Sequence, residues 1–221
     1  MRIVTCTDCG KRNKKNIEAG NGMIEKEAMY KIPYGLFMVS TPNGAKQNGC
    51  IVNTVSMITD NPKRITVYLN KSNYTEELIK AHGIFNVSIL TEKTPFEIFK
   101  QFGFQSGRDV DKFAGTDYPK TENGLYYLPN YANAVLSARV IDFHEYGTHT
   151  LFVAEVTEAK ALSSEASVTY GYYLENIKPK VQKSATEKWV CKICGYTHEG
   201  ELPQDFICPW CKHPAEDFEK V

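Results

Sequence analysis

The sequence lacks the features that mark several large classes of protein. Its 221 residues hold no apolar run approaching 18 residues and no apolar secretory segment near the start, so we expect neither a membrane span nor export. The 26 Lys and Arg equal the 26 Asp and Glu, so there is no basic excess of the kind that draws proteins to nucleic acid or anionic lipid. We therefore expect a cytoplasmic protein that binds neither nucleic acid nor a membrane.

Other absences narrow the possibilities further. No strand is followed by GxGxxG and a helix, so the usual dinucleotide-binding fingerprint is missing, and no internal repeat is evident. Hydrophobic residues make up 42% and charged residues 24%, which disfavours long disorder and disulfide scaffolds. The length suits one large globular domain or two of ordinary size.

Short runs of strand-forming residues, separated by Gly, Pro and Asn, dominate the chain between positions 34 and 156. They read YGLFMVST, GCIVNTVSMIT, RITVYLN, GIFNVSIL, AVLSARVIDF and HTLFVAEV. In RITVYLN the apolar residues Ile65, Val67 and Leu69 alternate with more polar ones, which indicates a half-buried strand. Many short strands with few helices predict a mainly β protein, a barrel or a sandwich.

Two helices are expected within this series. The first begins after Asn73, a good N-cap with Glu76 three residues later, and ends near Ala81 before His82-Gly83. The second covers positions 95–102, where proline opens the segment and phenylalanines recur at helical spacing.

The charge is divided unevenly along the chain. Positions 187–221 hold seven acidic and four basic residues, a net −3, which leaves +3 for positions 1–186. This division predicts a small acidic module tethered to a larger, mildly basic one. The polar, aperiodic stretch 174–186 is the expected linker, with a span of about 20 Å if flexible.

The strongest local signal is a pair of CxxC motifs in the acidic module. Cys191-x₂-Cys194 and Cys208-x₂-Cys211 are separated by thirteen residues, and two such turns supply a tetrahedral cage of four thiolates. A module of about 35 residues cannot fold on a hydrophobic core alone, so the metal must contribute folding energy. The spacing alone permits iron or zinc.

The residues around the cage favour iron. Gly195 lets backbone amides turn toward sulfur, and an aromatic shell is expected from Trp189, Tyr196, Phe206, Trp210 and Phe218. The segment WVCKICGYTHEGELPQDFICPWCKHPAEDF resembles a rubredoxin of the clipped kind found in rubrerythrins. Lys212 follows Cys211 where that family usually has glycine, which implies strain if the position needs a positive φ. A structural zinc ribbon is the alternative.

A second candidate site lies where RITVYLN meets the first helix. The helix start, the cation of Lys71 and the hydroxyls of Ser72 and Thr75 together make an anion pocket, with free amides expected near Tyr74 and Thr75. An ordinary capped helix beside a solvated lysine explains the same residues.

Residues 23–173 resemble the flavin reductase-like family of FMN-binding split barrels. The resemblance rests on NGCIVNTVSMIT, LNKSNYTEELI, FGFQSGRDVDKF, HTLFVAEV and TYGYY, in that order. It implies a split β-barrel, FMN near the interface of a homodimer, and NADH or NADPH as electron donor. The implied ring-lining residues are Asn53, Thr54, Val55 and Ser56.

The same resemblance assigns roles to three further groups. Lys71, Ser72, Tyr74 and Thr75 match the segment at the ribityl phosphate, in agreement with the anion pocket. The loop Ser106, Gly107 and Arg108 matches the one that closes on the cofactor. His149 matches the histidine beside the flavin where nicotinamide docks, although a lone histidine at a strand start is often structural.

The two resemblances together suggest a function. Nicotinamide gives up two electrons as a hydride and an iron centre accepts one, so flavin is needed between them. Such fusions resemble the high-molecular-weight rubredoxins, which implies an NAD(P)H:FMN/rubredoxin oxidoreductase serving a redox protein such as a flavodiiron protein. The alternatives are a flavin reductase with a structural zinc tail, and a non-enzymatic electron-relay flavoprotein without a nicotinamide site.

Three cysteines lie outside these motifs. Cys6-x₂-Cys9 falls on the polar stretch 1–22, which we expect to be a loosely held arm. Free thiols are the plain interpretation of this pair, and a redox dithiol or a metal shared across a dimer are the alternatives. Cys50 lies in an apolar run and is expected to be a small buried hydrophobic residue.

Overall fold

The structure is a computed structural model and describes residues 25–29, 31–179 and 188–221. The expected arm with Cys6 and Cys9, and much of the expected linker, lie outside these residues. The chain divides into two compact units, 1–32 and 33–221, of which the described part of the first contains the short helix α1 (Lys26–Met29). Among the described residues, no helix is both long enough and apolar enough to cross a membrane.

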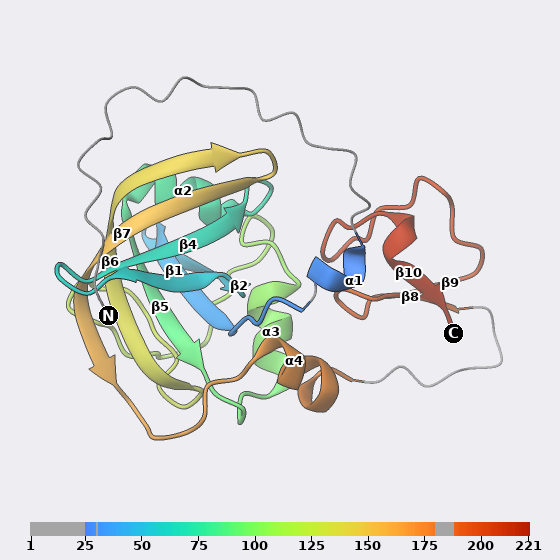
Figure 1. Cartoon of the computed structure of the whole chain (residues 1–221). Coiled ribbons are helices and arrows are strands. Elements are labelled where there is room, and N and C mark those ends of the chain that lie inside the picture. Colours follow the sequence, from blue (N-terminus) through green and yellow to red (C-terminus); the bar gives the residue numbers. More distant parts are fainter. Residues whose placement is uncertain (1–24, 30, 180–187) are drawn as a thin grey trace, which may run out of the picture. The chain divides into compact units, whose positions relative to one another are not determined.

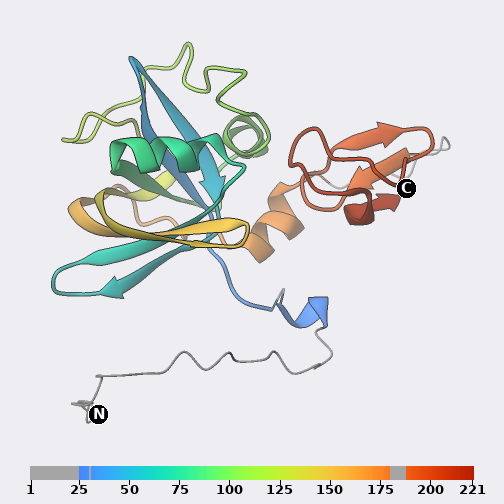
Figure 2. The ribbon, with the colours of Figure 1, turned by 90° about the horizontal axis from the view of Figure 1, so that it is seen from above.

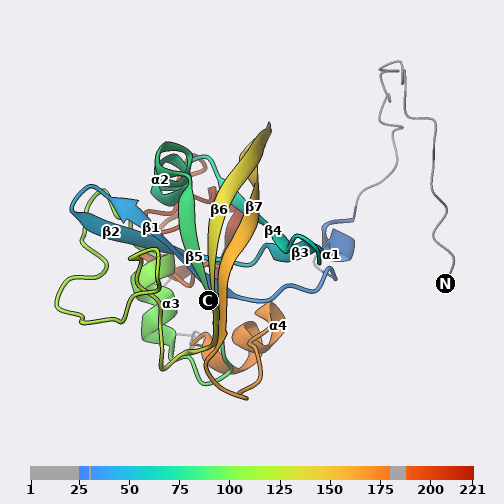
Figure 3. The same ribbon diagram turned by 90° about the vertical axis from the view of Figure 1, so that its left-hand side faces the viewer.

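The second unit contains a seven-stranded antiparallel sheet with the order β2-β1-β5-β6-β7-β4-β3 (Figure 1). Its strands are β1 (Phe37–Asn43), β2 (Lys46–Val52), β3 (Val55–Thr59), β4 (Arg64–Asn70), β5 (Ile84–Leu90), β6 (Ala132–Tyr146) and β7 (His149–Ala161). Figure 3 shows β6 and β7 as one long hairpin. Two register shifts between these strands mark β-bulges, which bend long strands.

The expected strand run GCIVNTVSMIT is broken in the structure. β2 pairs with β1, whereas β3 pairs with β4 at the opposite end of the strand order. Thr54 lies at the break, where its hydroxyl donates to the Tyr68 carbonyl at 3.0 Å and its own carbonyl accepts from the Tyr68 amide at 3.2 Å. The chain therefore leaves one edge of the sheet and begins the other within a few residues.

The two expected helices are present as α2 (Tyr74–His82) and α3 (Phe96–Gly103). The short helix α4 (Tyr170–Tyr172) and the π-helical turn η1 (Tyr173–Ile177) were not expected. α2 packs on β1 and α3 on β2. The predicted linker therefore starts inside a helical turn, and the domain boundaries stay a prediction.

The α2 cap differs from the expected one in a single respect. Asn73 caps the helix by accepting from the Thr75 amide at 3.0 Å, and Gly83 ends it at φ 70°. Glu76 does not return to the Asn73 amide, which donates to the Asn70 carbonyl instead. The Glu76 carboxylate is buried and accepts from the Thr150 hydroxyl at 2.5 Å. A tertiary partner on β7 has replaced the local capping box.

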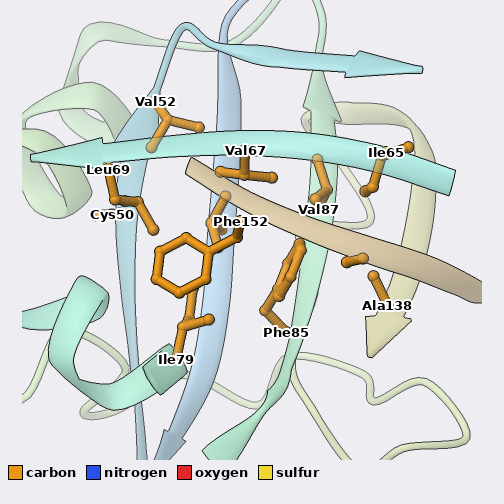
Figure 4. Packing of buried hydrophobic residues seen from close by; sticks show 12 residues of the cluster. Cys50, Val52, Ile65, Val67, Leu69, Ile79, Phe85, Val87, Ala138 and Phe152 are labelled. Atoms are coloured by element: carbon orange, nitrogen blue, oxygen red, sulfur yellow. The ribbon is translucent and has the colours of Figure 1, made fainter. Parts of the chain in front are cut away.

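The main core confirms a closed β architecture. Buried side chains from β2 and β4, which are far apart in the strand order, meet in one cluster with Ile79 of α2. Figure 4 shows the ring of Phe152 in this cluster, with Phe85 and Ile79 nearby. The alternation in β4 is confirmed for Ile65, Val67 and Leu69, each at most 4% exposed. The sheet thus curls around its own apolar face.

The C-terminal residues form a small sheet of their own, with the order β10-β8-β9 (Figure 2). Its strands are β8 (Lys188–Cys191), β9 (Thr197–Glu199) and β10 (Phe218–Lys220), and the 3₁₀ turn η2 (Ala215–Asp217) precedes β10. The sheet is too small to bury much apolar surface, because its core contains Phe218 and four cysteines with a few partly buried side chains. A bound metal must complete its stability.

Phe152 and Phe143 offer a matched test of the barrel core. Their rings lie 6.0 Å apart, but Phe152 is fully buried and Phe143 is 44% exposed. We expect Phe152→Ala to lower the free energy of unfolding by about 3–5 kcal/mol, because it leaves a cavity. Phe143→Ala should cost about 1 kcal/mol or less. Urea unfolding of both variants measures this, and equal losses would contradict the assigned core.

Candidate functional site

The four cysteines of the two CxxC motifs converge on one point. The sulfurs of Cys191, Cys194, Cys208 and Cys211 all lie within 4.8 Å of one another, and two of the pairs are 3.5 and 3.4 Å apart. Metal–sulfur bonds of about 2.3 Å in a tetrahedron require sulfur–sulfur separations of about 3.8 Å. Four thiolates at this spacing repel one another without a cation, so the cage fits a tetrahedral metal ion.

The two CxxC turns, which we call the first knuckle (Cys191–Cys194) and the second knuckle (Cys208–Cys211), have the same backbone geometry. The Gly195 amide donates to the Cys191 carbonyl at 2.8 Å, and the Lys212 amide donates to the Cys208 carbonyl at 2.9 Å. Both residues are left-handed, with φ of 80° at Gly195 and 62° at Lys212. Lys212 is the only non-glycine residue with positive φ in the described part of the chain. The positive φ on which the expected strain depends is therefore present at Lys212.

Backbone amides surround the sulfurs, as the knuckle sequence predicts. The amides of Ile193 and Cys194 face the Cys191 sulfur, and the His213 amide faces the Cys211 sulfur. Hydrogen bonding from the Cys194 thiol and from the His213 amide lowers the pKa of the Cys211 thiol. Such amides tune iron–sulfur potentials and stabilise a thiolate cage.

Four of the five predicted aromatic residues pack around the cysteines, and the fifth, Trp210, is partly exposed and stacks on a residue from outside the module. Phe218 is buried against the cysteines, and Trp189, Tyr196 and Phe206 pack beside it. Trp210 is 37% exposed, and its ring stacks on Phe104 from the segment after α3. Phe104 itself belongs to the cysteine cluster.

Lys212 gives a direct test of the second knuckle. We expect Lys212→Gly to stabilise the metal-loaded protein by up to about 1 kcal/mol, because glycine adopts positive φ without strain. Gly195→Ala should lose about 1–2 kcal/mol for the same reason. Denaturant-induced release of the metal reports both changes. A destabilising Lys212→Gly variant would show that the side chain contributes more than the backbone strain costs.

The predicted anion pocket is partly filled by the protein's own groups. The Thr75 amide, expected to be free, is bonded to Asn73, and the Ser72 amide and hydroxyl both bond the Asn70 side chain, at 2.9 and 3.0 Å. Lys71 forms an ion pair with Glu145 of β6. The side chains stand where the sequence placed them, but an anion would have to compete with Asn73 and Glu145 for them.

A network of ion pairs lies beside the predicted anion pocket. Lys80 pairs with both Glu76 and Glu145, each at 2.6 Å. The ammonium groups of Lys71 and Lys80 lower the pKa of Glu145 to about 2, so it stays ionised at any ordinary pH. Lys71 is thus held in place before any phosphate arrives, at the cost of a competing negative charge.

The predicted closing loop meets the start of α2. The Arg108 guanidinium lies 4.4 Å from the centre of the Tyr74 ring and pairs with Glu77. A Cβ added at Gly107 would lie 1.9 Å from Oδ1 of Asn48, so only glycine fits there. Asn48 in turn donates to the Thr75 hydroxyl at 2.9 Å. The loop 106–108 and the start of α2, far apart in sequence, therefore form one wall of the predicted anion pocket.

Strand β2 runs from the predicted anion pocket to a separate, apolar cavity. Asn48 lies beside Thr75, whereas Val52 and Asn53 at the far end of the strand line an apolar cavity of about 190 Å³. Five residues of strand separate Asn48 from Asn53, about 16 Å. One elongated ligand could therefore bind along β2, with its charged end at α2 and its apolar end in the cavity.

The same cavity reaches the metal cage. Its walls include Cys194 and Cys211, one cysteine from each knuckle, together with Phe104 and Tyr173. Burial raises the pKa of Tyr173 well above that of a free tyrosine, so its hydroxyl stays protonated. The apolar side chains around a metal site limit the access of solvent to it and influence its redox potential.

Of the remaining predicted residues, some lie near the apolar cavity and His149 lies near the predicted anion pocket. Asn53 borders the cavity, Thr54 and Val55 are half-buried where β3 begins, and Ser56 is exposed. His149 is exposed at the start of β7, paired in register with Asn70, so it lies near Lys71. Its Nδ1 is 2.8 Å from the Thr148 hydroxyl. The roles assigned to these residues stay predictions.

Sequence reasoning missed several residues that shape the site. Asn48 and Lys112 are buried, and Oδ1 of Asn48 lacks a partner among the described residues. The Lys112 ammonium donates to the carbonyls of Gly49 and Phe102 at 2.8 and 3.0 Å, and burial lowers its pKa. Cys50 is 2% exposed as predicted, with its pKa raised by burial. The sequence signal available for both residues was that Asn48 opens NGCIVNTVSMIT and Lys112 lies within FGFQSGRDVDKF, two of the segments that carry the family resemblance.

Gly107 tests the shared wall at α2. We expect Gly107→Ala to weaken FMN binding by about tenfold, because the new methyl forces the loop away from Asn48 at a cost of about 1–3 kcal/mol. Gly171→Ala is the matched control, since its nearest neighbour would be at 4.0 Å. Fluorescence titration of the flavin-free protein measures both affinities. Equal affinities would remove the loop from the binding site.

Comparison with known families assigns both parts of the chain. Residues 29–179 match the flavin reductase-like domain, and residues 189–219 match the rubredoxin-like domain of rubrerythrin. Both resemblances seen in the sequence are thereby confirmed. The matches imply flavin at the barrel and iron at the four cysteines, and the donor sets described above fit these groups.

Named relatives agree with this assignment. The high molecular weight rubredoxin of Moorella thermoacetica is 32% identical over 229 residues, covering 90% of this chain and 100% of that protein. The ferric-chelate reductase (NAD(P)H) of Archaeoglobus fulgidus is 38% identical over 163 residues, covering 74% of this chain and 96% of that protein. The NADH:FAD oxidoreductase SgcE6 of Streptomyces globisporus has the same fold, with a TM-score of 0.58 at 21% identity over 64% of this chain and 84% of that one.

Proposed function

The chain belongs to the flavin reductase-like family, and on that premise we propose that it is an NAD(P)H:FMN/rubredoxin oxidoreductase. It takes electrons from NADH or NADPH, passes them through FMN to its own iron centre and delivers them to an external acceptor. The observation that carries the proposal is the cavity that Cys194 and Cys211 share with Val52 and Asn53.

The electron count explains why both centres are needed. Oxidation of one NAD(P)H releases a hydride, which is two electrons and a proton, whereas a ferric centre takes one electron to become ferrous. Bound FMN supplies the conversion, because it accepts a hydride and releases single electrons. An iron held by Cys191, Cys194, Cys208 and Cys211 would supply one-electron transfer to the acceptor, twice for each NAD(P)H oxidised.

The protein's own residues hold the cofactor along β2. Lys71, Ser72, Tyr74 and Thr75 bind the phosphate at the start of α2, where the helix dipole favours an anion. The backbone from Asn53 to Ser56 follows the ring. Ser106, Gly107 and Arg108 close over the cofactor, and His149 orients the nicotinamide.

The relatives support the choice of donor. The relative from Archaeoglobus fulgidus carries NAD(P)H in its name, and the alignment covers 74% of this chain and 96% of that protein. The relative from Moorella thermoacetica aligns over nearly the whole chain. We propose a redox protein as acceptor, a flavodiiron protein being the expected kind. The acidic module would raise the association rate with a basic partner.

A homodimer is part of the same proposal. Several large apolar side chains are exposed on the sheet, namely Met57, Tyr68, Ile141, Phe143 and Tyr146, each at least 40% exposed. They come from β3 and β4, which are neighbours in the sheet, and from β6, which β7 separates from β4. Exposed apolar side chains of this size are found at protein interfaces. A second copy would cover them in a cytoplasmic dimer.

Anaerobic stopped-flow mixing with NADH or NADPH tests the proposed function. We expect the flavin absorption to bleach first and the ferric–thiolate absorption to follow. Cys208→Ser should keep the first phase and lose the second, because it removes one metal ligand. The matched variant Cys50→Ser leaves the cage intact and should keep both phases.

Two results would contradict the proposal. Absence of any bleaching by pyridine nucleotide would leave a relay protein reduced by a partner. Full activity in a zinc-loaded, iron-free preparation would leave a flavin reductase with a structural tail.

A further inference from the structure

We propose that the cysteine module docks on its own barrel through two contacts, one for each knuckle, and that electrons pass from flavin to iron within one chain in this docked arrangement. The inference rests on the proposed function and adds to it the route and the residues that hold it. We call these contacts the Trp210 contact and the Lys178 contact.

The Trp210 contact holds the second knuckle. The ring of Trp210 stacks on Phe104 with centroids 5.7 Å apart and an angle of 13° between the planes. The Lys100 ammonium of α3 lies 5.9 Å from the same ring. Trp210 stands between Cys208 and Cys211 in the sequence, so a fixed Trp210 fixes the turn that carries both ligands. Aromatic pairs of this kind contribute beyond the apolar area that they bury.

The Lys178 contact holds the first knuckle. The Lys178 ammonium donates to the carbonyls of Lys192 and Ile193 at 2.7 and 3.3 Å, between the two cysteines of that turn. Lys178 follows η1 directly, and its amide donates to the Tyr173 carbonyl at 2.8 Å. Burial lowers the pKa of Lys178, as expected for an ammonium held inside a contact. The helical turn and the first knuckle are therefore joined by a half-buried charge.

The two contacts frame the shared cavity. Phe104 of the Trp210 contact and Tyr173, to which Lys178 is bonded, both line it. Cys194 and Cys211 face it from the module, and Asn53 faces it from β2. Each knuckle thus places one cysteine beside the cavity where the flavin ring is proposed to lie. Two independent contacts, each with its own knuckle, set both the distance and the rotation of the cage.

Fluorescence tests the docked arrangement without flavin or turnover. In the zinc-loaded full chain with Trp189→Phe, Trp210 is the only tryptophan. We expect Phe104→Ala to shift its emission to longer wavelength and to increase acrylamide quenching at least about twofold, because the covering ring is removed. Phe143→Ala, on β6, should leave both unchanged. Unchanged emission in Phe104→Ala would overturn the docking proposal.

Electron-transfer rates test its consequence in the iron- and FMN-loaded protein. We expect Trp210→Ala combined with Lys178→Met to slow flavin-to-iron transfer about tenfold, since the docked population falls. Reduction of flavin by NADH should be unchanged, because neither residue lines the flavin pocket. Trp210→Phe keeps a ring for stacking and should restore most of the rate. The ferric–thiolate spectrum confirms that the cage is intact in each variant.

The outcomes separate this inference from the proposed function. A double variant with the parental transfer rate would show that the contacts do not set the electron route, while the enzyme assignment would stand. A parent chain that NADH and NADPH both fail to reduce would remove the proposed function, and the fluorescence result would still decide the docking.

Discussion

Val52 and Asn53 at the end of strand β2 and two cage cysteines, Cys194 and Cys211, line a single apolar cavity. Electron tunnelling falls steeply with distance, so a two-electron donor and a one-electron metal are useful together only if their edges are held close. The rest of the structure follows from this requirement. The barrel must carry β2 from the start of α2 to the cavity, and the module must present its sulfurs there.

In the barrel, the chain turns sharply after β2, and this turn leaves space for a ligand close to the cysteine cage. The break at Thr54 moves the chain from one edge of the sheet to the other, which leaves the end of β2 open beside α3 and η1 instead of covered by a continuing strand. The opposite end of β2 is enclosed by α2, the loop at Gly107 and the charges of Lys71, Glu145 and Lys80. A polar end and an apolar end of one strand thus give an elongated ligand a fixed direction.

The cysteine module is too small to be held in order by its own apolar core. Its apolar core consists of four cysteines and Phe218 with partly buried aromatics, so metal and contact with the barrel both contribute to its order. The ring of Phe104 extends that core from outside the module. An apolar cavity on one side and backbone amides around the sulfurs are also the means by which proteins set the potential of an iron centre.

Local sequence signals predicted the parts of the site that are built locally. The CxxC pairs, the left-handed Lys212 and the Asn73 cap all depend on residues a few positions apart, and each appears as expected. Contacts between distant segments were not predictable in this way. Asn48 with Thr75, Lys112 with two carbonyls, and Phe104 with Trp210 involve common residue types without a pattern, because burial decides their role. Glu76 shows the same rule, since a tertiary partner displaced the local one.

The most direct test is the dependence of flavin-to-iron electron transfer on protein concentration. After rapid reduction of the flavin by NADH or NADPH under anaerobic conditions, the rate constant for loss of the ferric–thiolate absorption is measured over a wide dilution series. Transfer across a cavity within one chain predicts a first-order rate constant that does not change with dilution. A rate that falls in proportion to concentration would show that electrons pass between separate molecules, and would contradict the shared cavity as the electron route.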